Sequence, residues 1–140
     1  MMLDFTILSE NMDVFLEGFK TTLFVSFLAL IGSFVLGTIL AIFRIAPIKP
    51  LNWLGAIYVE FVRNIPLLII LFFIFTGLPV FEIRLSGFVA GTVALTIYTA
   101  AFIAEAIRAG IMSVPKGQTE AARSSGLNYV QTMWYVILPQ

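Results

Sequence analysis

Two long runs without a charged residue dominate the chain. Residues 21–43 form a run of 23 residues, and residues 85–104 form a run of 20. At 1.5 Å per residue, helices of these lengths span about 34 Å and 30 Å, and the hydrocarbon core of a bilayer is about 30 Å thick. The pattern predicts transmembrane helices over about 19–43 and 85–104.

A third apolar stretch lies between these runs and is harder to place. Its uncharged part begins at Asn64, but Gly77 and Pro79 would break a helix near its end. The remaining stretch is short for a crossing. We therefore predict one helix over about 51–77 that is kinked at Pro66.

The composition supports a membrane location. The chain is 60% hydrophobic and 11% charged, whereas about a quarter of the residues of a soluble domain are charged. It contains no cysteine and no histidine, so thiolate metal sites and histidine acid–base chemistry are excluded from it. The net charge of zero does not suggest a nucleic-acid partner. The expected class is an all-α membrane protein.

Basic residues predict the orientation of the spans. They are concentrated after the first span and after the third span, and both segments are therefore expected in the cytosol. These basic residues are Arg44, Lys49, Arg63, Arg108, Lys116 and Arg123. The N-terminus is then outside. The acidic N-terminal segment also lacks the basic start of a cleaved signal peptide.

The third span carries small residues at helical spacing. They are Gly87, Gly91, Thr92, Thr96, Ala100 and Ala104. Small side chains at this spacing let helices approach closely in a membrane. The favoured interpretation is packing within a bundle, and a lining of the translocation path is the alternative.

The segment after the third span is polar and carries its own helix signals. Pro115 and Gly117 are expected to break the chain before a short helix over 119–125, and Gly126 suits the position that ends a helix. So short a helix is marginal alone in water and needs a partner or the bundle to hold it. From composition alone, an ordinary cytosolic loop is the favoured interpretation.

The spacing within "EAARSSGLNYVQTMWYVILP" changes that interpretation. It resembles the EAA signature of permease subunits in ABC importers: Glu-Ala-Ala, three residues, Gly, nine residues, an aliphatic residue, one residue and Leu-Pro. The matching positions are Glu120, Ala121, Ala122, Gly126, Val136, Leu138 and Pro139. Val136 replaces the usual isoleucine.

Other segments resemble the polar amino-acid subfamily of these permeases. "EGFKTTLFVSFLALIGSFVLGTILAIFR" is similar to its opening helix. "YVEFVRNIPLLIILFF" is similar to its Arg-x-Thr-Pro-Leu-Leu element, with Ile65 in place of threonine. "AAFIAEAIRAGIMSVPKGQTEAA" is similar to its Glu-x-x-Arg and Gly-Gln-x-Glu-Ala-Ala run. The resemblance covers nearly the whole chain after about residue 17, and the Lys116–Gln118 lead-in favours amino-acid importers.

The resemblance implies a multi-span helical bundle of the type I ABC importer permease kind. Residues 1–140 would be a partial permease domain with three transmembrane helices and a cytosolic coupling helix, and further spans would follow. The coupling helix belongs to the EAA loop, about 113–139, and would dock on a separate ATPase subunit. The implied coupling residues are Gly117, Gln118, Glu120, Ala121, Ala122, Arg123, Gly126, Leu138 and Pro139.

The implied function is import of polar amino acids across a bacterial inner membrane. The implied partners are an ATPase dimer, a second permease subunit, an extracytoplasmic substrate-binding protein and membrane lipid. The chain has no phosphate-binding Gly-x-x-x-x-Gly-Lys-Ser/Thr loop, so it is expected not to be an enzyme, and ATP and Mg would bind the ATPase subunit. The alternatives are a permease for another solute, such as methionine or an osmolyte, and a non-transporting scaffold that docks a cytosolic protein.

The pattern Glu-x-x-Arg occurs three times. The pairs are Glu60/Arg63, Glu105/Arg108 and Glu120/Arg123. Each can form an ion pair on one helix face, worth about 0.2–0.5 kcal/mol when exposed, and simple neutralisation is the favoured interpretation. Since ionisable groups at membrane depth are often functional, the first two pairs are also candidates for a gate. Direct contact of Glu105 and Arg108 with a zwitterionic substrate is the second hypothesis.

Overall fold

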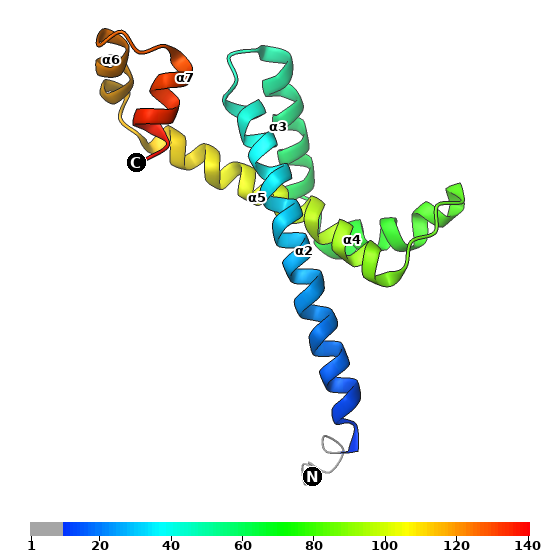
Figure 1. Ribbon diagram of the computed structural model, residues 1–140. Helices are drawn as coiled ribbons and strands as arrows, with labels where there is room; N and C mark the ends of the chain where they lie inside the picture. Colours follow the sequence, from blue (N-terminus) through cyan, green and yellow to red (C-terminus); the bar gives the residue numbers. More distant parts are fainter. Residues whose placement is uncertain (1–9) are drawn as a thin grey trace, which may run out of the picture.

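A computed structural model describes residues 10–140. Residues 1–9, which hold the first part of the expected extracytoplasmic tail, lie outside the described residues. The described part is helical, and two long helices, α2 and α5, cross each other near its centre (Figure 1). Both are long and apolar enough to cross a membrane.

The helix α2 (Met12–Ile45) contains the whole first predicted span, and α5 (Gly87–Ser113) contains the third from residue 87 onward. Asp13 lies in the first turn of α2 and Arg44 in its last turn, where each complements the helix dipole. The Ser86 hydroxyl accepts a hydrogen bond from the Val89 amide at 3.3 Å and caps the start of α5.

Small residues allow α2 and α5 to pack closely. A Cβ added to Gly37 would lie 2.8 Å from the Ile103 Cβ and 2.9 Å from the carbonyl oxygen of Ala100, and Ala100 and Ala104 are fully buried. A Cβ at Gly91, in contrast, would meet nothing within 4 Å. The packing interpretation is therefore confirmed for the later part of the series of small residues, and Gly91 takes no part in this contact.

This difference gives a matched pair of substitutions. We expect Gly37→Ala to lower the stability of the bundle by about 1–3 kcal/mol, because the added methyl group overlaps a backbone oxygen. Gly91→Ala adds the same group to open space and, since alanine favours a helix by about 1 kcal/mol over glycine, is expected to be neutral or stabilising. Thermal unfolding of the two purified variants measures the difference. Equal melting temperatures would contradict the packing described here.

The middle segment differs from its prediction. The single kinked helix expected over 51–77 is wrong: α3 (Lys49–Arg63) and α4 (Leu67–Phe72) are separate helices. The axis bends by 99° between Lys49–Arg63 and Leu67–Phe81, so this pair counts as a third span only if both parts are taken together. Pro66 explains the break, because it has no N–H to donate, disfavours helical geometry at the preceding residue, and itself has an extended ψ of 139°.

The end of the middle segment also differs from its prediction. A π-helical turn, η1 (Phe73–Gly77), and a 3-10 turn, η2 (Leu78–Phe81), continue past the glycine that was expected to end the helix. Pro79 lies in the first turn of η2. Backbone N–H groups in a first turn have no partner within the helix, so the absent N–H of proline costs no hydrogen bond there. A cluster of Ile74, Ala90 and Ala94 packs η1 on the first half of α5.

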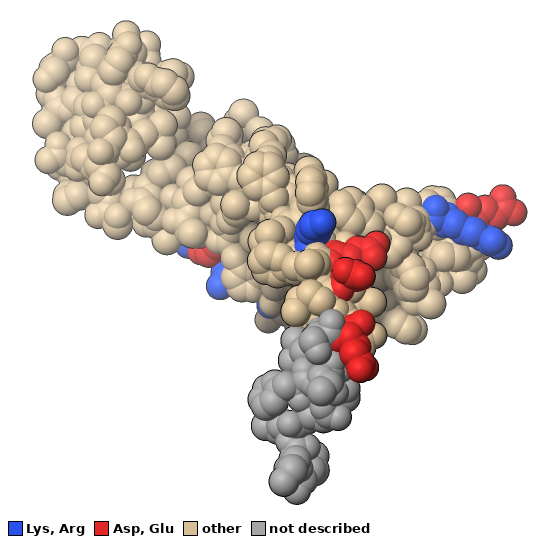
Figure 2. Space-filling view, turned by 60° about the horizontal axis from the view of Figure 1, so that its bottom comes forward, with Lys and Arg blue, Asp and Glu red and all other residues tan. Residues whose placement is uncertain are grey.

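Most large apolar side chains of the long helices point outward. On α2, Phe24, Phe27 and Phe34 are all more than half exposed. Figure 2 shows a face on which charged side chains are confined to a few places and the rest is uncharged. An apolar outer surface of this kind suits contact with lipid rather than water.

The EAA loop forms a small helical unit at one end of α5, away from α4 (Figure 1). It contains α6 (Lys116–Ser124), α7 (Tyr129–Thr132) and the π-helical turn η3 (Met133–Ile137). Gly117 lies inside α6, so its expected role as a breaker is wrong. The helix begins directly after Pro115, whose ψ of 135° makes it the N-cap.

Local hydrogen bonds define both ends of the link between α6 and α7. Gly126 has a φ of +87°, and the Gly126 and Leu127 amides donate to the carbonyls of Arg123 and Ala122 at 3.0 and 3.2 Å. This is the Schellman arrangement, and it confirms the predicted helix end. Asn128 then forms a capping box with Gln131, with both bonds at 2.9 Å.

Candidate functional site

The residues assigned to ATPase coupling lie mostly on the surface of the EAA loop. Ala122 is the exception: it is 7% exposed and buried where α6 packs on α7 and η3. It therefore supports the loop from inside and offers no side chain to a partner. The exposed members of the set are Gly117, Gln118, Glu120, Ala121, Arg123, Gly126, Leu138 and Pro139.

The helix α6 has two different faces. At 100° per residue, Gly117, Ala121 and Ser124 fall on one side, and all three are exposed. Lys116, Thr119 and Arg123 fall on the other side and line a cavity beside α5. The outer face has little side-chain bulk, so another protein surface can come close to the α6 backbone there. The EAA signature includes Ala121 and Ala122, but the sequence could not tell that Ser124, and not Ala122, completes this face.

Pro139 explains the geometry at the end of the loop. Both π-helical turns found within residues 10–140 directly precede a Leu-Pro pair. In η3 the Leu138 amide donates to the Met133 carbonyl at 2.9 Å, five residues back. Pro139 has no N–H for the Tyr135 carbonyl, and its ring crowds that carbonyl, which favours the wider turn. The side-chain amide of Gln140 donates to the Val136 carbonyl at 2.8 Å.

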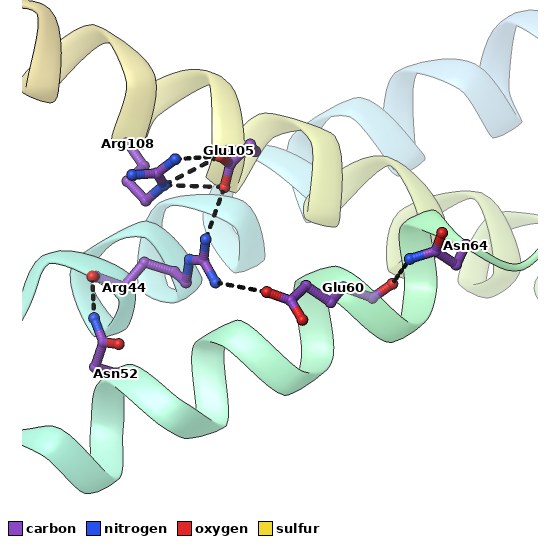
Figure 3. A network of polar contacts seen from close by, with 6 residues as sticks. All are labelled: Arg44, Asn52, Glu60, Asn64, Glu105 and Arg108. Carbon is purple, nitrogen blue, oxygen red and sulfur yellow. Dashed lines mark hydrogen bonds and ion pairs between the residues drawn. The ribbon is translucent and has the colours of Figure 1, made fainter.

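A network of charged side chains joins three helices about Arg44 (Figure 3). The Arg44 guanidinium of α2 lies 3.3 Å from a Glu105 carboxylate oxygen of α5 and 3.9 Å from a Glu60 oxygen of α3. The Arg108 Nε donates to both Glu105 oxygens at 3.1 Å. Arg44 and Glu105 are 15% and 21% exposed as side chains, whereas Glu60 is 75% exposed. Arg44 and Glu105 therefore form the centre of the network, and Glu60 is at its edge.

The three Glu-x-x-Arg repeats behave differently from one another. The pairing of Glu105 with Arg108 is confirmed. Glu60 pairs with Arg44 rather than with Arg63, and among the described residues Glu120 and Arg123 form no ion pair. Sequence spacing favours partners on the same helix, but the packing of α3 beside the end of α2 provides a partner from another helix. Arg44 was assigned only to the cytosolic end of the first span, so its role in the network was missed.

Arg63 has an aromatic partner instead of a carboxylate. Its guanidinium carbon lies 5.4 Å from the centroid of the Phe102 ring, and the Tyr98 ring packs against Phe102 with centroids 5.0 Å apart. A guanidinium at this distance from a ring face is attracted by its quadrupole. The group of Arg44, Arg63, Arg108, Glu60 and Glu105 therefore has one excess positive charge. Over residues 10–140, His, Cys, Asp and Glu side chains form no cluster suited to a metal ion.

Comparison with known proteins places the chain in a family. Residues 33–140 match the family described as "Binding-protein-dependent transport system inner membrane component". The chain belongs to this family. Relatives that resemble the chain include the "Probable glutamine ABC transporter permease protein GlnM" of Bacillus subtilis, which is 62% identical over 96% of this chain and 62% of the relative. The "Probable glutamine ABC transporter permease protein GlnP" of the same organism is 45% identical over 94% of this chain and 60% of the relative.

A solved structure gives the same placement. The "Crystal structure of an amino acid ABC transporter with histidines" superposes with a TM-score of 0.92 at 39% identity, covering all of this chain and 65% of the solved one. The fold is thus that of an amino-acid ABC transporter permease, as the EAA signature predicted. This binding-protein-dependent permease chain spans about three fifths of the length of the curated relatives it matches.

Proposed function

We propose that the chain acts in a membrane permease subunit of an ATP-driven importer of polar amino acids. ATP hydrolysis would occur on a separate ATPase subunit, which holds ATP and Mg. A second permease subunit and an extracytoplasmic substrate-binding protein would complete the importer, with the N-terminus outside. The names of the relatives support the substrate class, since the first two concern glutamine.

The observation that carries the proposal is the construction of α6. It is a short helix with a low-bulk exposed face, fixed at its end by the Schellman bonds and held by α7 and η3. It also lies directly beyond the end of α5, connected only through Val114 and Pro115. A partner that moved the outer face of α6 would therefore also move the end of α5. This is the connection that ATP-driven alternating access requires, because each state must be stabilised by different contacts.

The charged network supports a gate at the same end of the bundle. Glu105 connects α5 to α2 through Arg44, so a movement of α5 that separates these side chains removes an ion pair between the helices. In the proposed mechanism the network holds one of the two access states closed. Arg63, which keeps an excess positive charge, is a second candidate for contact with a substrate carboxylate.

Uptake by the assembled importer in proteoliposomes tests the substrate class. We expect accumulation of labelled glutamine in the presence of ATP and the binding protein, and competition by an excess of other polar amino acids. Methionine and an osmolyte such as glycine betaine serve as matched competitors of similar size and are expected to leave glutamine uptake unchanged. Competition by either would assign the chain to another solute class. Failure of any ATPase subunit to co-purify with the permease would favour the scaffold alternative.

A further inference from the structure

The EAA loop has a second exposed face, formed by α7, η3 and the residue after them. Val130, Trp134, Tyr135 and Leu138 follow one another at helical spacing, and each is more than half exposed. We call these four residues the aromatic face. On the other side of the same segment Thr132 is buried where α6 packs on α7, so the aromatic face is turned away from α6. No charged residue occurs from position 124 to position 140, and the aromatic face therefore offers no partner for an ion pair.

The aromatic face lies beside the end of the transmembrane helix α5. Ile137 and Leu138 line one cavity together with Ile107 and Val114, and Figure 1 shows the last part of the chain beside the end of α5. Since a carboxylate is costly within hydrocarbon, Glu105 marks the edge of the hydrocarbon core. Ile107 and Val114 lie about 3 and 14 Å beyond Glu105 at about 1.5 Å per residue. The headgroup layer is about 5–7 Å thick on each side of the core, so η3 lies at the level of the headgroups.

The kind of exposed aromatic residue changes between the spans and this end of the bundle. On α2 and α4 the exposed aromatic side chains are all phenylalanine. Within residues 10–140, the exposed tryptophan and tyrosine side chains are Trp53, Tyr129, Trp134 and Tyr135. Trp53 of α3 belongs to the same end, because its neighbour Asn52 donates a hydrogen bond to the Arg44 carbonyl at the end of α2. Tryptophan and tyrosine are enriched at the membrane–water interface, where the ring meets apolar groups and the N–H or O–H meets polar ones.

We propose that the aromatic face lies in the headgroup layer of the membrane, with lipid as its partner. The indole N–H of Trp134 and the hydroxyl of Tyr135 would donate to ester and phosphate oxygens, while the two rings and Leu138 contact the first methylenes of the acyl chains. This contact would hold the EAA loop against the bilayer and leave the outer face of α6 free for a protein. The proposal rests on the membrane location of the chain and not on the import function.

A spin label on the aromatic face distinguishes lipid from water and from protein. The chain has no cysteine, so Trp134→Cys places one nitroxide there in the assembled complex, with cysteines elsewhere in the complex replaced by serine. In nanodiscs, oxygen concentrates in the bilayer and a nickel chelate stays in water. We expect the ratio of collisions with oxygen to collisions with nickel to be at least about threefold higher at position 134 than at position 124, because a polar chelate is excluded from an apolar layer.

Ser124→Cys is the matched control. Ser124 is exposed like Trp134 but lies on the outer face of α6, where water or a docked protein would surround the label. Frequent collisions with both reagents at position 134 would place the aromatic face in water. Rare collisions with both would place it under protein, such as a further part of the permease or a second copy. Either result would overturn the proposal.

Tryptophan fluorescence tests the same contact with Trp134 in place. The difference in emission between the unchanged complex and its Trp134→Phe variant gives the emission of Trp134. We expect phosphatidylcholine brominated on the acyl chain close to the headgroup to quench at least about half of it, and bromination at the chain end to quench less, since tryptophan prefers the interface to the hydrocarbon core. Emission that neither lipid quenches would contradict the proposal. Neither measurement requires transport, so the membrane contact can fail while the proposed import function stands.

Discussion

The variant Ala121→Trp is expected to lower coupled transport strongly while the protein still inserts in the membrane. Ala121 lies on the outer face of α6 between Gly117 and Ser124, and all three are exposed. An indole there would hold any docked surface away from the α6 backbone. A loss of about 1.4 kcal/mol of docking energy lowers affinity tenfold, and we expect uptake to fall by at least about that factor. Uptake and substrate-stimulated ATPase activity of the complex are measured together.

Val130→Trp is the matched control for this experiment. Val130 is exposed in the same loop but belongs to α7 and not to α6. Near-normal uptake by this variant would show that bulk on the outer face of α6, and not bulk anywhere in the loop, blocks coupling. Normal uptake by Ala121→Trp would contradict the assignment of α6 as the coupling helix. Glu120→Lys, on the same exposed helix, is expected to act in the same direction through charge.

The variant Glu105→Gln is expected to give the largest loss of stability among the charged positions. It removes the carboxylate that faces both Arg44 and Arg108, and it leaves two half-buried guanidinium groups near each other. Charge-assisted hydrogen bonds at such sites contribute about 1.5–3 kcal/mol, and the melting temperature in nanodiscs measures the change. If the network also holds a gate closed, ATPase activity without substrate is expected to rise.

Glu60→Gln makes the same chemical change at the edge of the network. Glu60 is 75% exposed and lies 3.9 Å from Arg44, and exposed pairs of this kind contribute about 0–1 kcal/mol. Its melting temperature is expected to stay close to that of the unchanged protein. Equal melting temperatures for Glu60→Gln and Glu105→Gln would contradict the central place of Glu105. Unchanged uptake and ATPase activity in Arg108→Gln would remove the gate hypothesis.

The long helices α2 and α5 follow directly from the sequence because lipid requires long uncharged runs whose backbone groups are satisfied within one segment. The end of α6 follows for a similarly local reason, since Gly126 adopts a positive φ that other residues adopt at a cost of about 1–2 kcal/mol. The start of α6 could not be predicted from the sequence in this way. A glycine disfavours a helix interior by about 1 kcal/mol, and the other bonds of α6 outweigh this at Gly117.

Other failures of the sequence prediction concern residues that are distant along the chain. The Arg44–Glu105 pair spans 61 positions, and nothing in the spacing of either residue indicates the other. The contact of Arg63 with Phe102 likewise depends on how α3 packs on α5. At Pro66 the sequence indicated an irregular helix but not how far the axis would bend. The bend angle depends on which parts of the bundle the two halves pack against.

The break between α3 and α4 has a mechanical consequence. Its polar groups are satisfied locally: the Asn64 side chain donates to the Glu60 carbonyl at 2.7 Å, and the Ile65 amide donates to the Val62 carbonyl at 3.3 Å. The two halves also pack on different parts of α5. Val59 of α3 packs beside Ala100 and Ala104, and the segment after α4 packs beside Ala90 and Ala94. A movement of only one part of α5 could therefore carry α3 without α4, or α4 without α3, with the three residues between them as the pivot.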